Sequence, residues 1–368
     1  MTQIDIAHQR LFNQYLLQPT LSTAQDVASW LGAVQAQDYA AAKWAVGMRM
    51  EKANEIDIEQ AFNRGSLLRT HLLRPTWHFV TPADIRWLLT LTAPRVHAVN
   101  GTMYRQLELD ETVFAQCYRV LVKELQDGQQ LTRDELREKL RLAGIATDNL
   151  LRVTYIMMWA ELERIICSGP RRGKQFTYML LEERVPPAGP LTRDEALAEL
   201  SRRYFLSRGP ATVADFARWS GLTIADARHG LDAVKNLLVE EVIEGRSYWL
   251  PPTAPITPAA APQAYLLSVY DEYVSGYKDR SAIGEAEVGP KLIALGNALA
   301  YIIVVDGQIV GTFRRVLQKK GVTIEANLFR ALTEAEDEAM VAAAHRFADF
   351  INLPLTQLLR GSATGMPG

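Results

Sequence analysis

Residues 192–250 read TRDEALAELSRRYFLSRGPATVADFARWSGLTIADARHGLDAVKNLLVEEVIEGRSYWL. Thr192 with Glu195 three residues later fits a capping box, so a helix is expected to begin there. We expect helices at about 192–207, 212–219 and 223–238, then strands Val239–Ile243 and Ser247–Leu250 joined through Glu244-Gly245-Arg246. Three helices followed by a two-stranded ribbon are the plan of a winged helix, which is a helix-turn-helix with a wing.

Two earlier parts of the chain show the same order of elements. The first is expected to hold helices at about 4–17, 22–32, 38–50 and 57–64 and the strands Leu67–Leu73 and Thr76–Val80. The second is expected to hold helices at about 111–126, 132–142 and 148–167, the basic turn Pro170-Arg171-Arg172-Gly173-Lys174 and the strand Gln175–Glu182. Capping boxes at Ser22–Gln25 and Thr132–Glu135, and Thr81 before Pro82, mark helix starts. The sequence therefore predicts three tandem winged helices.

The remainder of the chain has a different character. Pro251–Pro262 is rich in proline and alanine and is typical of a linker, whereas the final GSATGMPG is expected to be a frayed tail. Strands are expected at Tyr265–Tyr270, Leu299–Val305, Gln308–Arg314 and Val322–Leu328, with a hairpin at Asp306-Gly307 and a capped helix at about 334–352.

The fold class is therefore α+β. We expect tandem winged-helix repeats, mostly helical, with a C-terminal antiparallel β-rich module. The expected domains are winged helix 1 at 1–105, winged helix 2 at 106–187, winged helix 3 at 188–255 and the C-terminal module at 256–368.

Composition narrows the class of protein. The 368 residues are 48% hydrophobic and 22% charged, as in an ordinary globular protein. The two cysteines, Cys117 and Cys167, lie far apart in helical patterns, so we expect reduced thiols and neither zinc nor an iron–sulfur cluster. No secretion signal or membrane span is evident, which predicts a cytoplasmic protein. Because the net charge is −2, a DNA-binding face would have to be local.

Common catalytic signatures are missing from the sequence. It contains no P-loop, no dinucleotide fingerprint, no GxSxG elbow and no HxE…PCxxC motif. The six histidines are scattered, and His71 and His78 lack metal-ligand spacing, so structural histidines are expected and no metal site.

Four stretches could carry chemistry, and each also has a plain structural interpretation. In Val34-Gln35-Ala36-Gln37-Asp38-Tyr39, two amides on one side of an extended backbone could hold a water, or could simply form a polar turn between helices. The stretch Arg69-Thr70-His71-Leu72-Leu73-Arg74-Pro75-Thr76-Trp77-His78-Phe79 places two arginines on a predicted hairpin. They could bind phosphate or form a salt-bridged strand pair.

The other two stretches are rich in tyrosine or in positive charge. Tyr270-Asp271-Glu272-Tyr273-Val274-Ser275-Gly276-Tyr277-Lys278-Asp279-Arg280 could bring tyrosines and the cations Lys278 and Arg280 to DNA, or could pack this module on the winged helices. The basic turn with Arg171, Arg172 and Lys174 could be a wing tip on the DNA backbone or a solvated face.

The first three stretches together resemble, in their order along nearly the whole chain, the AlkZ/YcaQ-type winged-helix proteins. This family includes bacterial glycosylases that unhook interstrand crosslinks and remove alkylated purines. The resemblance implies a concave DNA-binding surface, a catalytic pair at Gln35 and Gln37 that positions the hydrolytic water, and a hairpin around 270–280 that meets DNA. One branch of the family carries Gln-x-Gln and the other Gln-x-Asp. Because Gln37 occupies the second place, the sequence is similar to the AlkZ-like branch.

The implied chemistry is physically reasonable. Hydrolysis of an N-glycosidic bond passes through an oxocarbenium-like sugar. A purine alkylated at N7 or N3 is already cationic and leaves without a strong acid, so two amides that position water could be enough. No lysine nucleophile is evident near the motif, so a monofunctional enzyme is expected.

Our first hypothesis is therefore a base-excision DNA glycosylase. It would act without a cofactor, as a monomer associated with the nucleoid, on double-stranded DNA with alkylated or crosslinked bases. The proposed DNA-binding residues are Arg69, Arg74, Thr76, His78, Arg171, Arg172, Lys174, Tyr277, Lys278 and Arg280. The alternatives are a non-enzymatic winged-helix DNA-binding protein or transcriptional regulator, and a protein-binding scaffold. A regulator would need a dimerisation helix that is not evident and would have no use for the glutamine pair.

Overall fold

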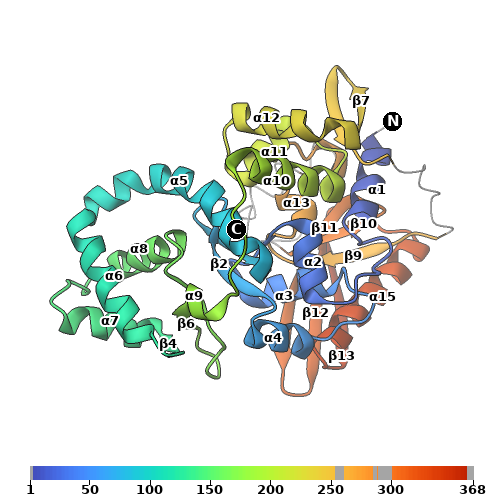
Figure 1. Cartoon of the computed structure of the whole chain (residues 1–368). Coiled ribbons are helices and arrows are strands. Elements are labelled where there is room, and N and C mark those ends of the chain that lie inside the picture. Colours follow the sequence, from blue (N-terminus) through green and yellow to red (C-terminus); the bar gives the residue numbers. More distant parts are fainter. Residues whose placement is uncertain (1–2, 253–260, 285–287, 289–300, 363–368) are drawn as a thin grey trace.

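The computed structural model describes residues 3–252, 261–284, 288 and 301–362. Figure 1 shows a large body on the right and a smaller lobe on the left, linked by the long helix α5 (Pro82–Gln106). Pro94 lies inside α5, and the helix curves as it leaves the body. The curve carries the chain away from the body and into the lobe.

The first unit builds a three-stranded sheet among helices. Its strands lie in the order β1-β3-β2, so the two-residue β1 is an edge strand. The elements are α1 (Gln3–Asn13), α2 (Ala24–Leu31), β1 (Val34–Gln35), α3 (Tyr39–Gly47), α4 (Glu55–Arg64), β2 (Leu68–Leu72) and β3 (Thr76–Val80). Thr23 and Asp26, rather than Ser22 and Gln25, form the capping box of α2, so that prediction was wrong by one residue.

The second unit forms the lobe, with strand order β4-β6-β5. Its elements are α6 (Glu111–Leu125), β4 (Leu131–Thr132), α7 (Arg133–Leu142), α8 (Leu150–Leu162), β5 (Ile166–Ser168), β6 (Thr177–Leu180) and α9 (Leu181–Arg184). The long helix expected at 148–167 ends early, because the chain reverses at Arg164 with a φ of 61° and continues as β5. The basic turn therefore connects two paired strands, as in a wing.

The third unit follows the predicted plan closely. It contains α10 (Arg193–Arg208), α11 (Val213–Ser220), α12 (Ile224–Val234), a 3-10 turn (Lys235–Leu237), β7 (Val239–Ile243) and β8 (Arg246–Leu250). Glu244 and Gly245 both have positive φ, 50° and 74°, as a tight hairpin with the right-handed strand twist requires. The capping boxes at Thr132, Thr192 and Thr333 are also confirmed.

The C-terminal module is a five-stranded sheet in the order β13-β12-β11-β10-β9, covered by one long helix. Its elements are β9 (Ala264–Leu267), α13 (Glu272–Ser275), a 3-10 turn (Ser281–Ile283), β10 (Tyr301–Val305), β11 (Gln308–Gln318), β12 (Gly321–Leu328), α15 (Glu334–Phe350) and β13 (Leu355–Ser362). Four strands are antiparallel, but β13 pairs with β12 in parallel. Gly361 and Ser362 thus belong to a strand, and only 363–368 of the expected tail lie outside the described residues.

The segment 270–280 differs most from expectation. It forms no hairpin: Asp271 caps the short helix α13, and the chain then turns toward the third unit. Most of the expected linker, 253–260, lies outside the described residues.

Hydrophobic cores cross the expected domain boundaries. One core packs α2, α3 and α4 against the C-terminal sheet and α15, with Trp44 against Phe347 and Phe350. A second joins β2, β3 and α5 to α10 and α11, with Tyr204, Phe216 and Trp219 in contact. Because the four expected parts share hydrophobic cores, none of them is packed independently of its neighbours. The division into four domains is still a proposal. In the described part of the chain, no helix combines the length and apolar character needed to cross a membrane.

Candidate functional site

Gln35 and Gln37 lie where β1 leads into α3. Gln35 is the last residue of β1, is 8% exposed, and is paired with His78 of β3. Ala36 donates its backbone N–H to the Trp77 carbonyl at 2.8 Å, which extends the ladder by one bond. Gln37 is exposed and precedes Asp38, whose side chain caps α3. The two amide side chains therefore lie at the edge strand β1, which is paired with β3, and next to the start of α3.

Hydrogen bonds fix how both amides are turned. Arg74 Nη2 donates to Gln35 Oε1 at 3.0 Å, and the Trp77 backbone N–H donates to Gln37 Oε1 at 3.2 Å. Both donors can only donate, so the amide oxygens must face them. Each amide consequently presents its NH2 group and the second lone pair of its oxygen to other partners. Two such groups can orient a water or a polar edge of a bound molecule.

Arg69 and Arg74 support this edge from within the protein. Arg69 is 8% exposed, and it donates to Ala36 O at 2.9 Å and to Gln37 O at 3.4 Å while lying over the Trp77 ring. Burial lowers the pKa of Arg69 to about 10 and also lowers the pKa of Arg74. Arg74 donates to backbone carbonyls of Arg218 and Trp219 as well as to Gln35. Both guanidiniums are therefore engaged inside the protein.

His71, His78 and the Thr76 hydroxyl are also turned inward. His78 is fully buried, and burial followed by the charge of Arg74 holds its pKa well below the usual range, so the ring is neutral. Its Nδ1 donates to Thr76 O at 2.9 Å. His71 is 3% exposed and paired with Glu161, and the Thr76 hydroxyl is buried. Direct DNA contact by His78 is therefore not available in this structure, contrary to expectation.

The tyrosine-rich segment is mainly interior. Tyr277 is 1% exposed, and its hydroxyl donates to Arg208 O and accepts from Gln14, so its expected DNA contact is replaced by packing. Asp271 binds Arg49 with both carboxylate oxygens, at 2.8 and 3.0 Å. Tyr270 is the exception: it is half-buried, has a φ of 63°, and its pKa is raised by burial and by nearby Asp38. Its ring consequently lies near the start of α3.

Three further cations are accessible on α11 and at the end of the tyrosine-rich segment. Lys278 and Arg280 are exposed at the end of the tyrosine-rich segment, and Arg218 is exposed on α11. The charges of Arg218 and Arg280 are close enough for Arg218 to lower the pKa of Arg280, after the larger effect of burial. The same Arg218 adds to the lowering of the Arg74 pKa. Sequence reasoning missed Arg218, because an arginine late in a short helix gave no signal of its own.

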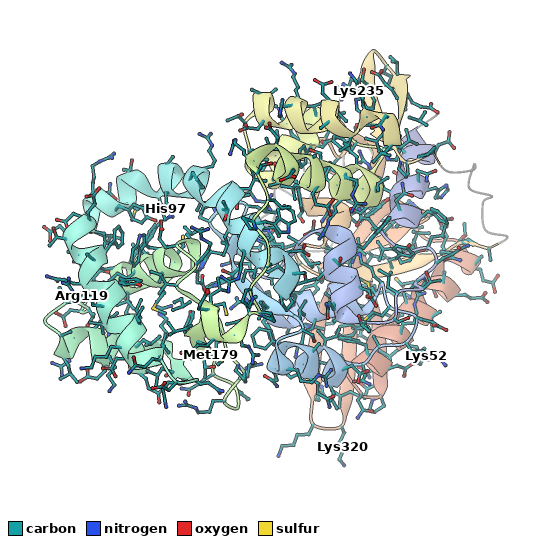
Figure 2. The ribbon with its side chains drawn as sticks, in the orientation of Figure 1. Lys52, His97, Arg119, Met179, Lys235 and Lys320 are labelled. Atoms are coloured by element: carbon teal, nitrogen blue, oxygen red, sulfur yellow. The ribbon has the colours of Figure 1, made fainter. Side chains whose placement is uncertain are left out.

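The expected wing tip is only partly free. Arg171 lies over Tyr39 and Phe176 and is 3.5 Å from Glu59, and Arg172 is paired with Glu135 at 2.7 Å. Lys174 is exposed. A second basic tip, also missed from the sequence, lies between β11 and β12. Figure 2 shows Lys320 projecting from that hairpin, at the lower edge of the molecule.

Two further features limit the chemistry. In the described residues, no group of three or more His, Cys, Asp or Glu side chains has the arrangement of a metal site. Lys43, which is close to the glutamines in sequence, is 5% exposed and held at 2.8 Å by both Glu55 and Glu59. A buried lysine whose Nζ is engaged by two carboxylates is a poor nucleophile.

Three helix-and-wing units with accessible cations beside a polar edge strand define a winged-helix DNA-binding protein. The family model described as "DNA glycosylase AlkZ-like" matches residues 28–350, so the chain belongs to the AlkZ-like DNA glycosylase family. It is therefore a hydrolytic enzyme, which sets aside the regulator and scaffold alternatives.

The chain is also similar to a curated relative in sequence and to a solved structure in fold. The chain is 28% identical over 336 residues to the interstrand DNA cross-link repair glycosylase of Streptomyces sahachiroi, covering 85% of this chain and 88% of that protein. The solved structure of the Streptomyces sahachiroi DNA glycosylase AlkZ has the same fold. Its TM-score is 0.78 at 22% identity, over 98% of this chain and 99% of that one.

Proposed function

We propose that this glycosylase hydrolyses the N-glycosidic bond of purines alkylated at N7 or N3, with the attacking water held between Gln35 and Gln37. The observation that carries the proposal is the fixed orientation of the two amides by Arg74 and the Trp77 backbone. A cationic base leaves readily, so the enzyme must mainly hold water and sugar in place. Neutral amides suit this task, and unmodified purines are expected to be poor substrates.

Glu272 is another group that could be considered as a general base, because it accepts a hydrogen bond from the Gln35 backbone N–H. Both of its carboxylate oxygens are already occupied, by Gln35 N, by the Arg208 guanidinium and by the Trp219 indole. A buried carboxylate that already accepts hydrogen bonds from three protein groups is poorly placed to act on a water in the site. This favours the glutamine pair. The ion-paired Lys43 likewise supports a monofunctional enzyme without a strand-cleaving step.

We also propose that Arg218, Lys278 and Arg280 bind phosphates next to the damaged nucleotide, with Lys174 and Lys320 reaching the duplex further away. The side chains of these residues are exposed, although Arg280 also donates from Nε to Val274 O at 3.1 Å, whereas Arg69 and Arg74 are engaged internally. Crosslinked nucleotides are included among the substrates because the Streptomyces sahachiroi relative is named a cross-link repair glycosylase.

The test uses purified protein and duplexes that carry one N7-methylguanine or one N7-linked interstrand crosslink. Base release is measured as alkali-revealed strand breaks under single-turnover conditions. Gln35→Ala and Gln37→Ala are expected to abolish release while DNA affinity stays unchanged, because the amides act on water rather than on the backbone. The control is Gln126→Ala, an exposed glutamine in the second unit. Wild-type activity that survives both active-site changes would rule out the glutamine mechanism.

A further inference from the structure

The tyrosine-rich segment contains two buried carboxylates in succession, and they do different things. Asp271 forms an ion pair with Arg49, at 2.8 Å, that ties the segment to the end of α3. Glu272 is completely buried, and one of its oxygens accepts a hydrogen bond from the backbone N–H of Gln35 in β1. The sequence left DNA contact and internal packing open for this segment. Of the two carboxylates, only Glu272 contacts the strand that carries Gln35, which points to a role for Glu272 in shaping the site.

The contact of Glu272 with Gln35 follows from the geometry of an edge strand. In the β1–β3 ladder, Gln35 is directly opposite His78, and the cross-strand hydrogen bond comes from the next residue, Ala36. The N–H of Gln35 therefore points away from β3, where no further strand exists. Glu272 Oε1 accepts this N–H at 2.8 Å. The carboxylate takes the place of a missing neighbouring strand.

Arg208, the ion-pair partner of Glu272, binds the backbone just before β1. Arg208 is fully buried and donates to Glu272 Oε2 from Nη2 at 2.7 Å and from Nε at 3.2 Å. The same guanidinium donates to Leu31 O at 2.7 Å and to Ala33 O at 3.1 Å. The Arg208–Glu272 pair thus binds residues 31–35 at both ends. The position of the Gln35 peptide depends on this pair.

We infer that Glu272 is a positioning residue of the glycosylase, which acts by holding the β1 edge so that the Gln35 amide meets the attacking water. The inference rests on the proposed role of Gln35 and extends it to a residue that touches neither water nor DNA. A shift of about 1 Å in a reacting group can cost roughly 100-fold in rate. Loosening β1 is therefore expected to slow base release without weakening DNA binding.

The experiment compares Glu272→Gln with Asp271→Asn in the full-length protein. A glutamine at 272 cannot serve both sides, because its NH2 group must face either the Gln35 N–H or the donors of Arg208 and Trp219. Asp271→Asn weakens an equally buried arginine pair in the same segment that does not contact β1. It is therefore the matched control for lost stability. The double variant Glu272→Gln/Arg208→Gln removes the unpaired buried charge that the single change creates.

Single-turnover base release, DNA affinity and hydrogen exchange are measured for each variant. Glu272→Gln and the double variant are expected to release base roughly 10- to 100-fold more slowly with unchanged Kd and faster exchange in residues 31–37. Asp271→Asn should keep the wild-type rate. Recovery of the rate in the double variant would overturn the proposal, since Glu272 would then only neutralise Arg208. Unchanged exchange at 31–37 in Glu272→Gln would overturn it as well, even if the wild type released no base and the proposed function itself had failed.

Discussion

An arginine near a DNA-binding site could either align a catalytic side chain or bind a DNA phosphate. Replacing Arg74 with methionine distinguishes these two roles. Arg74 Nη2 lies 3.0 Å from Gln35 Oε1, and its other nitrogen donates to backbone carbonyls of α11. A hydrogen bond from a charged donor contributes about 1.5–3 kcal/mol. If that bond is what aligns the Gln35 amide in the transition state, its loss slows single-turnover base release by roughly 10- to 150-fold.

DNA affinity gives the contrasting readout for Arg74→Met. A phosphate contact contributes about 0.9 to the slope of log Kobs against log salt concentration. Because the guanidinium is engaged internally, Arg74→Met is expected to leave that slope unchanged. The control is Arg184→Met, which removes comparable bonds to the carbonyls of Phe62 and Asn63 far from the glutamines along the chain. A slope reduced by about 0.9 with an unchanged rate would refute the internal role of Arg74.

Three other predictions concern accessible charge, thiol reactivity and acid stability. Lys278→Met and Arg218→Met should each reduce the salt slope by about 0.9 and leave the rate at saturating enzyme unchanged, as shown by fluorescence anisotropy and single-turnover release. Burial raises the pKa of Cys167 to about 12, so thiol reagents should label it only after unfolding, as followed by mass spectrometry. The hydrogen bond from Arg330 holds the pKa of Glu336 at about 2, below its unfolded value of about 4.3. The stability that Glu336 adds is therefore present above about pH 4.3 and lost toward pH 2, so the urea midpoints of wild type and Glu336→Gln should converge over that range.

Local signals predicted the helices and hairpins well. Three capping boxes mark helix starts in the structure, and the Glu244-Gly245 turn joins two paired strands. These features depend on a few neighbouring residues, which is why the sequence reveals them. β13 was missed, because a parallel pairing with β12 depends on the sheet and not on a nearby turn.

The site was harder to predict, because its supports come from distant parts of the chain. The glutamine pair was singled out from its spacing and from the family resemblance, and its catalytic role is still a prediction. For the tyrosines and charges at 270–280 the sequence left DNA contact and internal packing open. In the structure Tyr273 and Tyr277 are buried, and Asp271 and Glu272 face buried arginines, which agrees with the packing interpretation. Composition cannot distinguish a polar surface from a polar interior whose partners lie 64 and 222 residues away along the chain, as Arg208 and Arg49 do.

The bond from Gln35 to Glu272 spans 237 positions of the chain. At roughly 5–20 residues per second, a ribosome needs about 12–47 seconds to add that many residues. A nascent first unit can close its helices and wing during this time, but the outward N–H of its edge strand is left to water. The repeats look like separable units, yet the edge strand of the first is completed by a residue of the C-terminal module. A first unit transplanted onto another protein would keep the bonds from Arg74 and Trp77 to the glutamine side chains but would lose the carboxylate that accepts the Gln35 backbone N–H.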